Sequence, residues 1–260
     1  MDVSKLIAEI EQVAPLLWAA DWDKSGLLVT GLRQDIQKIA VALEPSVDVV
    51  NRAVTWGADF ILTHHPLNLK PEFPSQKNNY FYVLKQLLTQ DVYLYCAHTS
   101  LDSNISGPVS WLANVLKMHS LDVVDTHPKV KEQKVGFGII GFLPEVRVGR
   151  DFVLELKSLL GVVGFRCIGK IPDRVERVAY CPGSGSFLAK KAFDLGADIF
   201  ITGDVKYHDA LELEKWGCVL DVGHFVLEEK MMEVFCLELS RRLDELQFYF
   251  FQGKDPFAYI

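Results

Sequence analysis

The stretch IAVALEPSVDVVNRAVTWGADFILTHH, residues 39–65, aligns without a gap with VAYCPGSGSFLAKKAFDLGADIFITGD, residues 178–204. Both copies carry the triplet GAD at the same place, at residues 57–59 and 196–198. Each copy has a run of β-favouring residues, a turn, a segment with helical periodicity that ends at glycine, and a second apolar run. The stretch therefore predicts one βαβ unit in each half of the chain.

Serine and glycine mark the ends of the two predicted helices. Ser46 stands where the first helix begins, and Ser184 or Ser186 stands at the corresponding place in the second copy. A serine at that position accepts a hydrogen bond from an N–H group in the first helical turn. Gly57 and Gly196 follow the helices, where glycine tolerates the left-handed backbone that ends a helix.

The similarity continues farther along both halves. LYCAHTSLD (94–102) resembles LDVGHFVLE (220–228), because each is an apolar strand that ends in a small residue and a histidine, with a carboxylate four residues later. Residues 78–91 and 205–217 lie between these markers and have helical periodicity. Each half is therefore predicted to be β-α-β-α-β, with parallel strands joined through helices.

The remaining segments complete the two halves. We predict strands around a helix at 151–160, then a long helix at 225–245 and an aromatic-rich strand in the tail. A chain of 260 residues suits two domains of common size. The predicted fold class is α/β, with two similar halves, residues 1–126 and 127–260.

Composition argues against several classes of protein. With 49% hydrophobic residues and a formal charge of −7, the chain predicts a folded globular protein without the basic surface that binds DNA or RNA. Its five cysteines are scattered and form no C-x-x-C motif, which favours reduced thiols over disulfides or a thiolate zinc site. The N-terminus has neither a signal-peptide pattern nor a membrane-length apolar run. We therefore expect a cytoplasmic protein.

Residues that commonly bind metals gather at four predicted strand ends. In parallel α/β sheets, ligands bind beyond the carboxyl ends of the strands. The four ends carry these groups: Thr63, His64 and His65; His98 with Asp102; Thr202, Gly203 and Asp204, followed by His208; and His224 with Glu228. A lone histidine at a strand end is more often an ordinary hydrogen-bonded polar residue than a ligand, but the recurrence of these groups in a repeated framework favours a ligand site.

The spacing of these residues predicts a metal centre. His224 and Glu228 are four residues apart at a helix start, so they share one face. His64 and His65 cannot point the same way along a regular strand, but at its end they can approach two ions from different directions. Imidazole and carboxylate suit zinc, iron, manganese, cobalt or nickel. The motif CPGSGS (181–186) favours a tight turn over a phosphate site, because it lacks a full nucleotide-binding pattern.

Several blocks of the sequence resemble, in order, those of the Nif-three-like family, whose bacterial members include GTP cyclohydrolase I type 2 homologues. The blocks are DWDKSGLLVTG (21–31), LTHHPL (62–67), AHTSLD (97–102), PGSGS (182–186), TGDVKYHDA (202–210), DVGHFVLEE (221–229) and DPF (255–257). The resemblance covers nearly the whole chain. It departs mildly at Asp204, where many members carry Glu, and at DWDKSG, where DN-x-G is usual.

The resemblance implies a site of two divalent metal ions shared by the two halves, and commonly a homohexamer. Its ligand pattern falls here on residues of the expected types: His64, His65, Asp102, His224 and Glu228. His98 and Asp204 are then candidate catalytic proton carriers beside the metals.

Three functions fit such a site. The first is a metal-dependent hydrolase, which the resemblance implies acts on GTP with release of formate; a phosphoester or another nucleotide-like small molecule fits the same chemistry. The second is a non-catalytic metal-binding scaffold or regulatory interaction protein, and the third is metal storage or delivery. We expect the hydrolase, because paired metal ions at a strand-end crevice are typical of hydrolytic sites.

Overall fold

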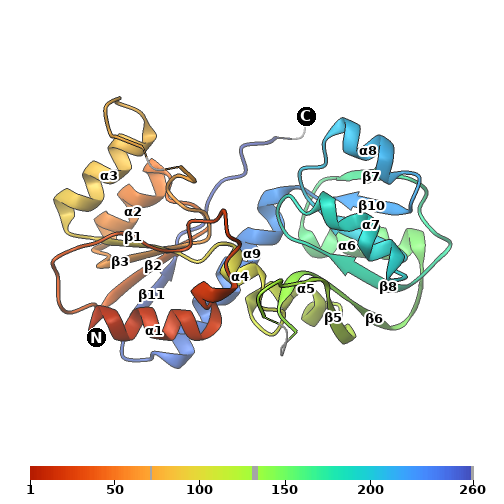
Figure 1. Ribbon diagram of the computed structural model, residues 1–260, viewed down its shortest axis with the longest axis horizontal. Helices are drawn as coiled ribbons and strands as arrows, with labels where there is room; N and C mark the ends of the chain where they lie inside the picture. The colour runs from red at the N-terminus through yellow and green to blue at the C-terminus, as the bar shows by residue number, and fades with distance from the viewer. Residues whose placement is uncertain (71, 131–133, 259–260) are drawn as a thin grey trace. The chain divides into compact units, whose positions relative to one another are not determined.

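The computed structural model describes residues 1–70, 72–130 and 134–258. The chain forms two compact units, each built around its own sheet (Figure 1). The first unit comprises Met1–Leu101 and Glu229–Lys254, and the second comprises Asp102–Glu228 and Asp255–Ile260. Two of the three boundaries fall inside helices, α4 (Thr99–Asp102) and α9 (His224–Arg242), and the third follows Lys254 in the tail.

The first unit contains a five-stranded sheet in the order β1-β4-β3-β2-β11. Strands β2, β3, β4 and β11 run parallel, whereas β1 pairs with β4 in the antiparallel direction. The bounds are β1 Gly26–Val29, β2 Lys38–Ala42, β3 Phe60–Thr63, β4 Tyr93–Cys96 and β11 Gln247–Phe250. The register pairs Ala42 with Thr63 and Thr63 with Cys96, so these three strands end level with one another.

Helices cover both faces of this first sheet. On one face, α2 (Val47–Trp56) and α3 (Asn79–Gln90) bury a shared apolar core with the strands (Figure 1). On the other lies α1 (Val3–Val13), and the Tyr95 hydroxyl donates a hydrogen bond to the Glu11 carboxylate at 3.0 Å. A short 3-10 helix, η1 (Leu16–Trp18), follows α1.

The second unit contains a six-stranded sheet in the order β5-β6-β8-β9-β10-β7. Strands β8, β9 and β10 are parallel, and the flanking strands pair in the antiparallel direction. The bounds are β5 His119–Thr126, β6 Gly136–Val148, β7 Arg166–Ile168, β8 Arg174–Tyr180, β9 Ile199–Thr202 and β10 Cys218–Asp221. Thr202 pairs with Asp221, so β9 and β10 also end level.

Helices again pack on this second sheet. An apolar core joins it to η3 (Ser186–Leu188), α7 (Ala189–Asp194) and α8 (Tyr207–Leu213). The Tyr180 hydroxyl donates to the Val109 carbonyl at 2.9 Å, which fixes η2 (Pro108–Ser110) against β8. The other helices of this unit are α5 (Trp111–Val115) and α6 (Gly149–Leu160).

The two sheets confirm the α/β class and the internal repeat. The first copy is β2-α2-β3 and the second is β8, η3 with α7, and β9, each with parallel strands. Ser46 caps α2 as predicted, since its side chain accepts from the Val49 N–H, and Gly57 ends that helix with φ +86°. The expected serine cap of the second helix is wrong, because Gly185 precedes η3 and makes no side-chain cap bond. Ser184 donates instead to Asp204.

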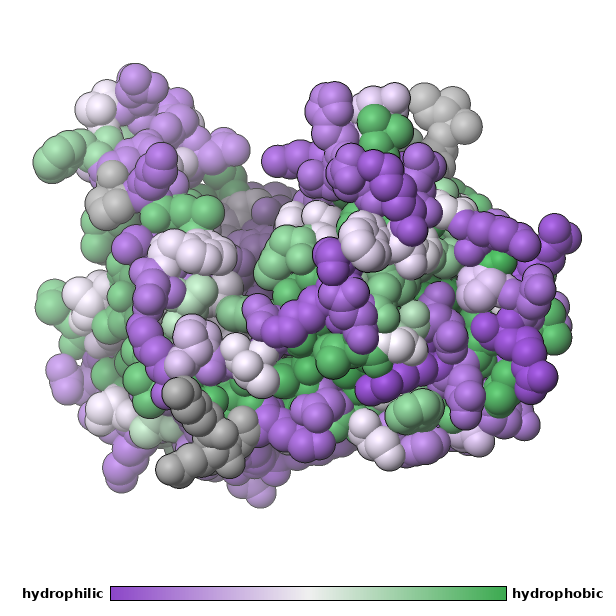
Figure 2. Space-filling model, turned by 45° about the vertical axis from the view of Figure 1, so that its right-hand side comes forward, coloured by the Kyte–Doolittle hydropathy of each residue, from purple (hydrophilic) through white to green (hydrophobic). Residues whose placement is uncertain are grey.

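The surface mixes hydrophilic and hydrophobic side chains. On the face in Figure 2, hydrophilic groups project outward and hydrophobic groups lie between them. Exposed apolar side chains such as Leu32 in the first unit and Leu154 in the second are ordinary features of a protein surface. Among the described residues, no helix combines the length and apolar character needed to cross a membrane.

Candidate metal centre

His64 and His65 lie immediately after β3, where the regular strand geometry ends. Both of their backbone N–H groups donate to the Leu43 carbonyl, at 3.1 and 2.8 Å. The Thr63 hydroxyl donates to the His65 carbonyl at 2.8 Å, which closes the turn. Because the chain bends here, the side-chain alternation of a strand no longer applies. The two rings therefore lie side by side, with centroids 5.2 Å apart.

The His64 ring is fixed by the next strand. Its side chain is fully buried, and its Nδ1 atom lies 2.9 Å from the Ala97 carbonyl oxygen. A carbonyl oxygen only accepts hydrogen bonds, so Nδ1 carries the proton and Nε2 carries the lone pair. This arrangement is the one that orients a metal-binding histidine.

His98 is oriented by a carboxylate from a distant segment. Its Nδ1 atom lies 2.7 Å from Asp23 Oδ1, and Ser25 and Thr99 also donate to the Asp23 carboxylate. Burial alone would raise the pKa of Asp23, but the hydrogen bonds from His98, Thr99 and Ser25 hold it well below its usual range. Asp23 therefore stays ionised and directs the His98 Nε2 atom away from itself.

These three histidines form one cluster in the first unit. Each offers a ring nitrogen, and the three nitrogens lie within 4.8 Å of one another. The His64 and His98 centroids are 5.0 Å apart, and those of His65 and His98 are 5.7 Å apart. Converging imidazole nitrogens are typical of a transition-metal site. In His64 and His98 the other ring nitrogen is held by a carbonyl or a carboxylate, as is usual for metal-binding histidines.

The second unit brings His224 and Glu228 together at the start of α9. The His224 Nε2 atom lies 2.8 Å from Glu228 Oε2, and its Nδ1 atom lies 2.7 Å from Asp204 Oδ2. Burial lowers the pKa of His224, but the Glu228 and Asp204 carboxylates outweigh it and raise the pKa to about 9. A cation that replaced this proton would find an imidazole and a carboxylate already paired.

Asp102 lies in the same region of the second unit. Burial raises the pKa of the Cys181 thiol, and the nearby carboxylates of Asp102 and Glu228 raise it further. Both carboxylates therefore act on one thiol at the end of β8. Two acidic side chains in a buried region supply the charge that a divalent cation requires.

The glycine-rich turn after β8 shapes this acidic region. Gly183 has φ +63°, and a Cβ atom there would lie 2.3 Å from Glu228 Oε1. The Gly203 N–H donates to the Gly183 carbonyl at 2.9 Å, and the Gly185 N–H donates to the Thr202 hydroxyl at 3.0 Å. The turn is thus held tightly against β9, and its glycine leaves room for the Glu228 carboxylate.

The structure therefore gathers the predicted residues into two groups, one in each unit. His64 and His65 join His98 in the first, and His224 and Glu228 join Asp204 in the second. His208 lies on α8, where its ring contacts Tyr207, and belongs to neither of these two groups. Sequence reasoning missed Asp23 and Gly183, although both stand in blocks that carry the family resemblance.

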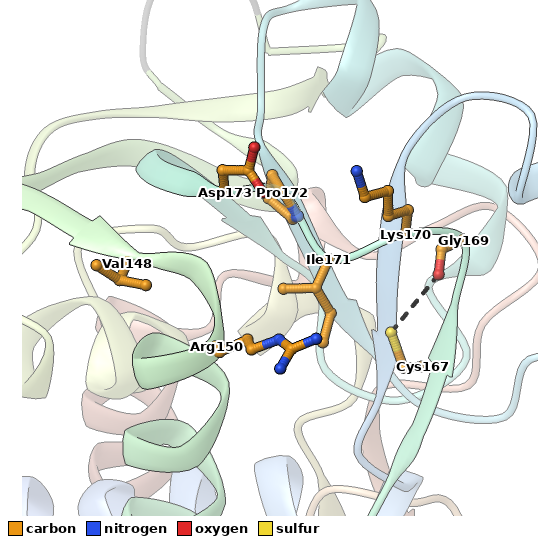
Figure 3. A pocket seen from close by; sticks show the side chains of 8 residues that line it. All are labelled: Val148, Arg150, Cys167, Gly169, Lys170, Ile171, Pro172 and Asp173. Atoms are coloured by element: carbon orange, nitrogen blue, oxygen red, sulfur yellow. Dashed lines mark hydrogen bonds between the residues drawn. The ribbon is translucent and has the colours of Figure 1, made fainter.

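A separate cavity of about 510 Å³ lies in the second unit (Figure 3). It adjoins the start of α6 and the connection from β7 to β8, and Arg150 and Lys170 contribute to its lining. Cys167 lies at its edge, with Sγ 3.9 Å from the Gly169 carbonyl (Figure 3). None of the predicted ligand residues lines this cavity.

The fold and the histidine cluster together define a two-unit α/β protein with a candidate metal centre, and comparison with known proteins gives its family. A model of the Duf34/NIF3 family (NGG1p interacting factor 3) matches residues 1–256. The chain therefore belongs to the Duf34/NIF3 family, which confirms the resemblance seen in the sequence.

Individual relatives match along the whole chain. A Clostridium perfringens (strain 13 / Type A) protein named GTP cyclohydrolase 1 type 2 homolog is 31% identical over 264 residues, with all of both chains covered. The crystal structure of a Bacillus cereus protein related to NIF3 has a TM-score of 0.91 at 22% identity, covering 100% of this chain and 99% of that one. A crystal structure of a Staphylococcus aureus protein has the same TM-score and the same coverage at 25% identity.

Proposed function

We propose that this chain is a metal-dependent hydrolase that holds two divalent cations and acts on a nucleotide or similar small molecule. The proposed ligands are His64, His65, Asp102, His224 and Glu228. The observation that carries the proposal is the convergence of imidazole nitrogens within 4.8 Å in the first unit. Converging imidazole nitrogens are a donor set typical of divalent transition-metal sites.

The donor set fits divalent transition metals. Nitrogen and carboxylate oxygen ligands suit zinc, iron, manganese, cobalt and nickel, and they do not distinguish strongly among these ions. The buried Glu228 carboxylate, 3% exposed, needs a positive partner, and the His224 imidazolium supplies one at 2.8 Å. Divalent cations would supply the same positive charge without a proton.

The chain's own residues can hold and move protons around such a centre. A bound divalent cation supplies Lewis acidity and lowers the pKa of a coordinated water. Asp23 holds His98 by Nδ1, so that Nε2 is the atom from which His98 can give or accept a proton. Asp204 accepts from His224 Nδ1 and from the Ser184 hydroxyl, which places a second carboxylate beside the centre as a proton carrier.

The names of the relatives support a nucleotide substrate. The Clostridium perfringens relative is named a GTP cyclohydrolase 1 type 2 homolog. For this chain we propose hydrolysis of a GTP-like purine nucleotide with release of formate, and hydrolysis of a phosphoester is the alternative reaction at the same centre. The proposed assembly is a homohexamer in the cytoplasm.

The test is a turnover assay on protein of known metal content. Purified protein, reloaded with each metal in turn, is offered GTP, other nucleotides and phosphoesters, and formate and phosphate are measured. Glu228→Gln should lose turnover while the protein remains folded, whereas Glu245→Gln, the same change at an exposed site, should leave turnover unchanged. No turnover by any metal-loaded form, with assembly lost in Glu228→Gln, would instead support a non-catalytic metal-binding scaffold.

A further inference from the structure

A small pocket lies within the first unit, lined in part by the chain segments that also carry Asp23 and His65. Its volume is about 220 Å³, and it opens where α3 packs against β1. The segment before β1 and the segment after β3 complete its wall. The lining residues that matter here are Lys24, Leu28, Leu67, Lys70, Tyr80 and Leu84.

The floor of the pocket is apolar. Leu28, Leu67 and Leu84 are partly buried and pack against the core between the sheet and its helices. The Tyr80 hydroxyl donates to the Glu72 carbonyl at 3.1 Å, which fixes the tyrosine ring in the wall. Apolar side chains packed against the core favour a ligand with a planar or aliphatic body.

The rim of the pocket is positively charged. Among the described residues, no carboxylate forms an ion pair with Lys24 or Lys70, whereas other lysines, such as Lys190 with Asp194, do form such pairs. The neighbouring Glu72 carboxylate is occupied by the amides of Asn68 and Asn78, at 2.8 and 3.1 Å. Two ammonium groups above an apolar floor favour an anion with an apolar body.

Two residues that line the pocket stand close in the sequence to the candidate site residues. Lys24 directly follows Asp23, whose carboxylate holds His98. Leu67 stands two residues after His65. Two lining residues of the pocket, Lys24 and Leu67, are therefore within two residues of groups that belong to the histidine cluster or hold it.

We propose that this pocket binds the non-reacting part of the substrate, with Lys24 and Lys70 receiving an anionic group and the leucines and Tyr80 receiving an apolar or aromatic body. This inference rests on the proposed function and specifies its substrate class. The substrate is a small aromatic or otherwise apolar molecule with a phosphate or a comparable anion.

The test uses phenyl phosphate as the probe, with inorganic phosphate and phenol as its separate parts. Binding to metal-free protein is measured by isothermal titration calorimetry at low ionic strength, so that no metal contributes. The double variant Lys24→Gln, Lys70→Gln should bind phenyl phosphate roughly 10-fold more weakly, since two partly screened charge contacts are lost. Lys85→Gln, an exposed lysine on α3 outside the pocket, is the matched control and should bind like the unchanged protein.

Further outcomes separate the pocket from the metal centre. Phenyl phosphate should bind more tightly than either phosphate or phenol, and its affinity should fall as salt is added. Equal affinity of the unchanged protein and the double variant would overturn the proposal, and so would equal affinity for phosphate and phenyl phosphate. A protein that binds metal and turns over substrate but fails this test keeps the proposed function and loses only the pocket assignment.

Discussion

Gly183→Ala tests whether the Glu228 carboxylate is a metal ligand, because the substitution displaces this carboxylate without changing its chemistry. The residue has φ +63°, and an added Cβ atom would lie 2.3 Å from Glu228 Oε1, far inside a normal contact of about 3.5 Å. The left-handed backbone alone costs an alanine about 1–2 kcal/mol. In addition, the Glu228 carboxylate must move by about 1 Å, because the turn that holds Gly183 is pinned to β9.

Gly161→Ala supplies the control for the backbone effect. Gly161 ends α6 with φ +65°, but no described heavy atom lies within 4 Å of an added Cβ atom. Both variants should therefore lose a similar amount of unfolding free energy from the backbone, measured by urea denaturation. Only Gly183→Ala should also lose metal affinity, by about 10- to 100-fold, measured by competition with a chelator. Equal metal affinity in the two variants would refute a ligand role for Glu228.

The remaining predictions concern two buried carboxylates. Asp23→Asn should lower the unfolding free energy by about 1–3 kcal/mol at pH 7, because it removes a carboxylate that accepts from His98, Thr99 and Ser25. Since the pKa of Asp23 is lowered by folding, its contribution is present above the unfolded pKa and is lost as pH falls, so the variant should show a weaker acid dependence in urea titrations. Burial raises the pKa of Glu229, so the unchanged protein loses unfolding free energy as pH rises above about 4.5 and this carboxyl group ionises. Compared with the unchanged protein at the same pH, Glu229→Gln should therefore gain unfolding free energy between pH 4 and pH 7, measured by urea denaturation. A pH profile of Glu229→Gln that matches that of the unchanged protein would contradict this reasoning.

Local sequence signals predicted the repeated core well. The β2-α2-β3 unit has a serine cap, a terminal glycine and two apolar strands, each within a few residues, so periodicity and end signals agree. The histidines proposed as ligands stand out in the sequence because each follows a buried strand in the repeated framework. The predicted serine cap of the second helix was wrong, because the Ser184 hydroxyl donates to Asp204, 20 residues away, and does not accept from the helix backbone.

Features set by long-range contacts could not be predicted in the same way. The bond between Asp23 and His98 spans 75 residues, and no local pattern pairs them. The tail strand β11 returns to the first sheet and pairs with β2, although the sequence shows only its strand character. Such pairings depend on how two surfaces fit once the chain has folded, and the periodicity of either segment does not encode the partner.

Metal content of the purified protein tests the central claim most directly. Inductively coupled plasma mass spectrometry, together with titration of metal-free protein, gives the number of divalent ions per chain. We expect two ions per chain in the unchanged protein, and a clear loss in His65→Ala and in Glu228→Gln but not in Glu245→Gln. A protein that binds no divalent ion after titration, or that binds the same number in all four forms, would contradict the account.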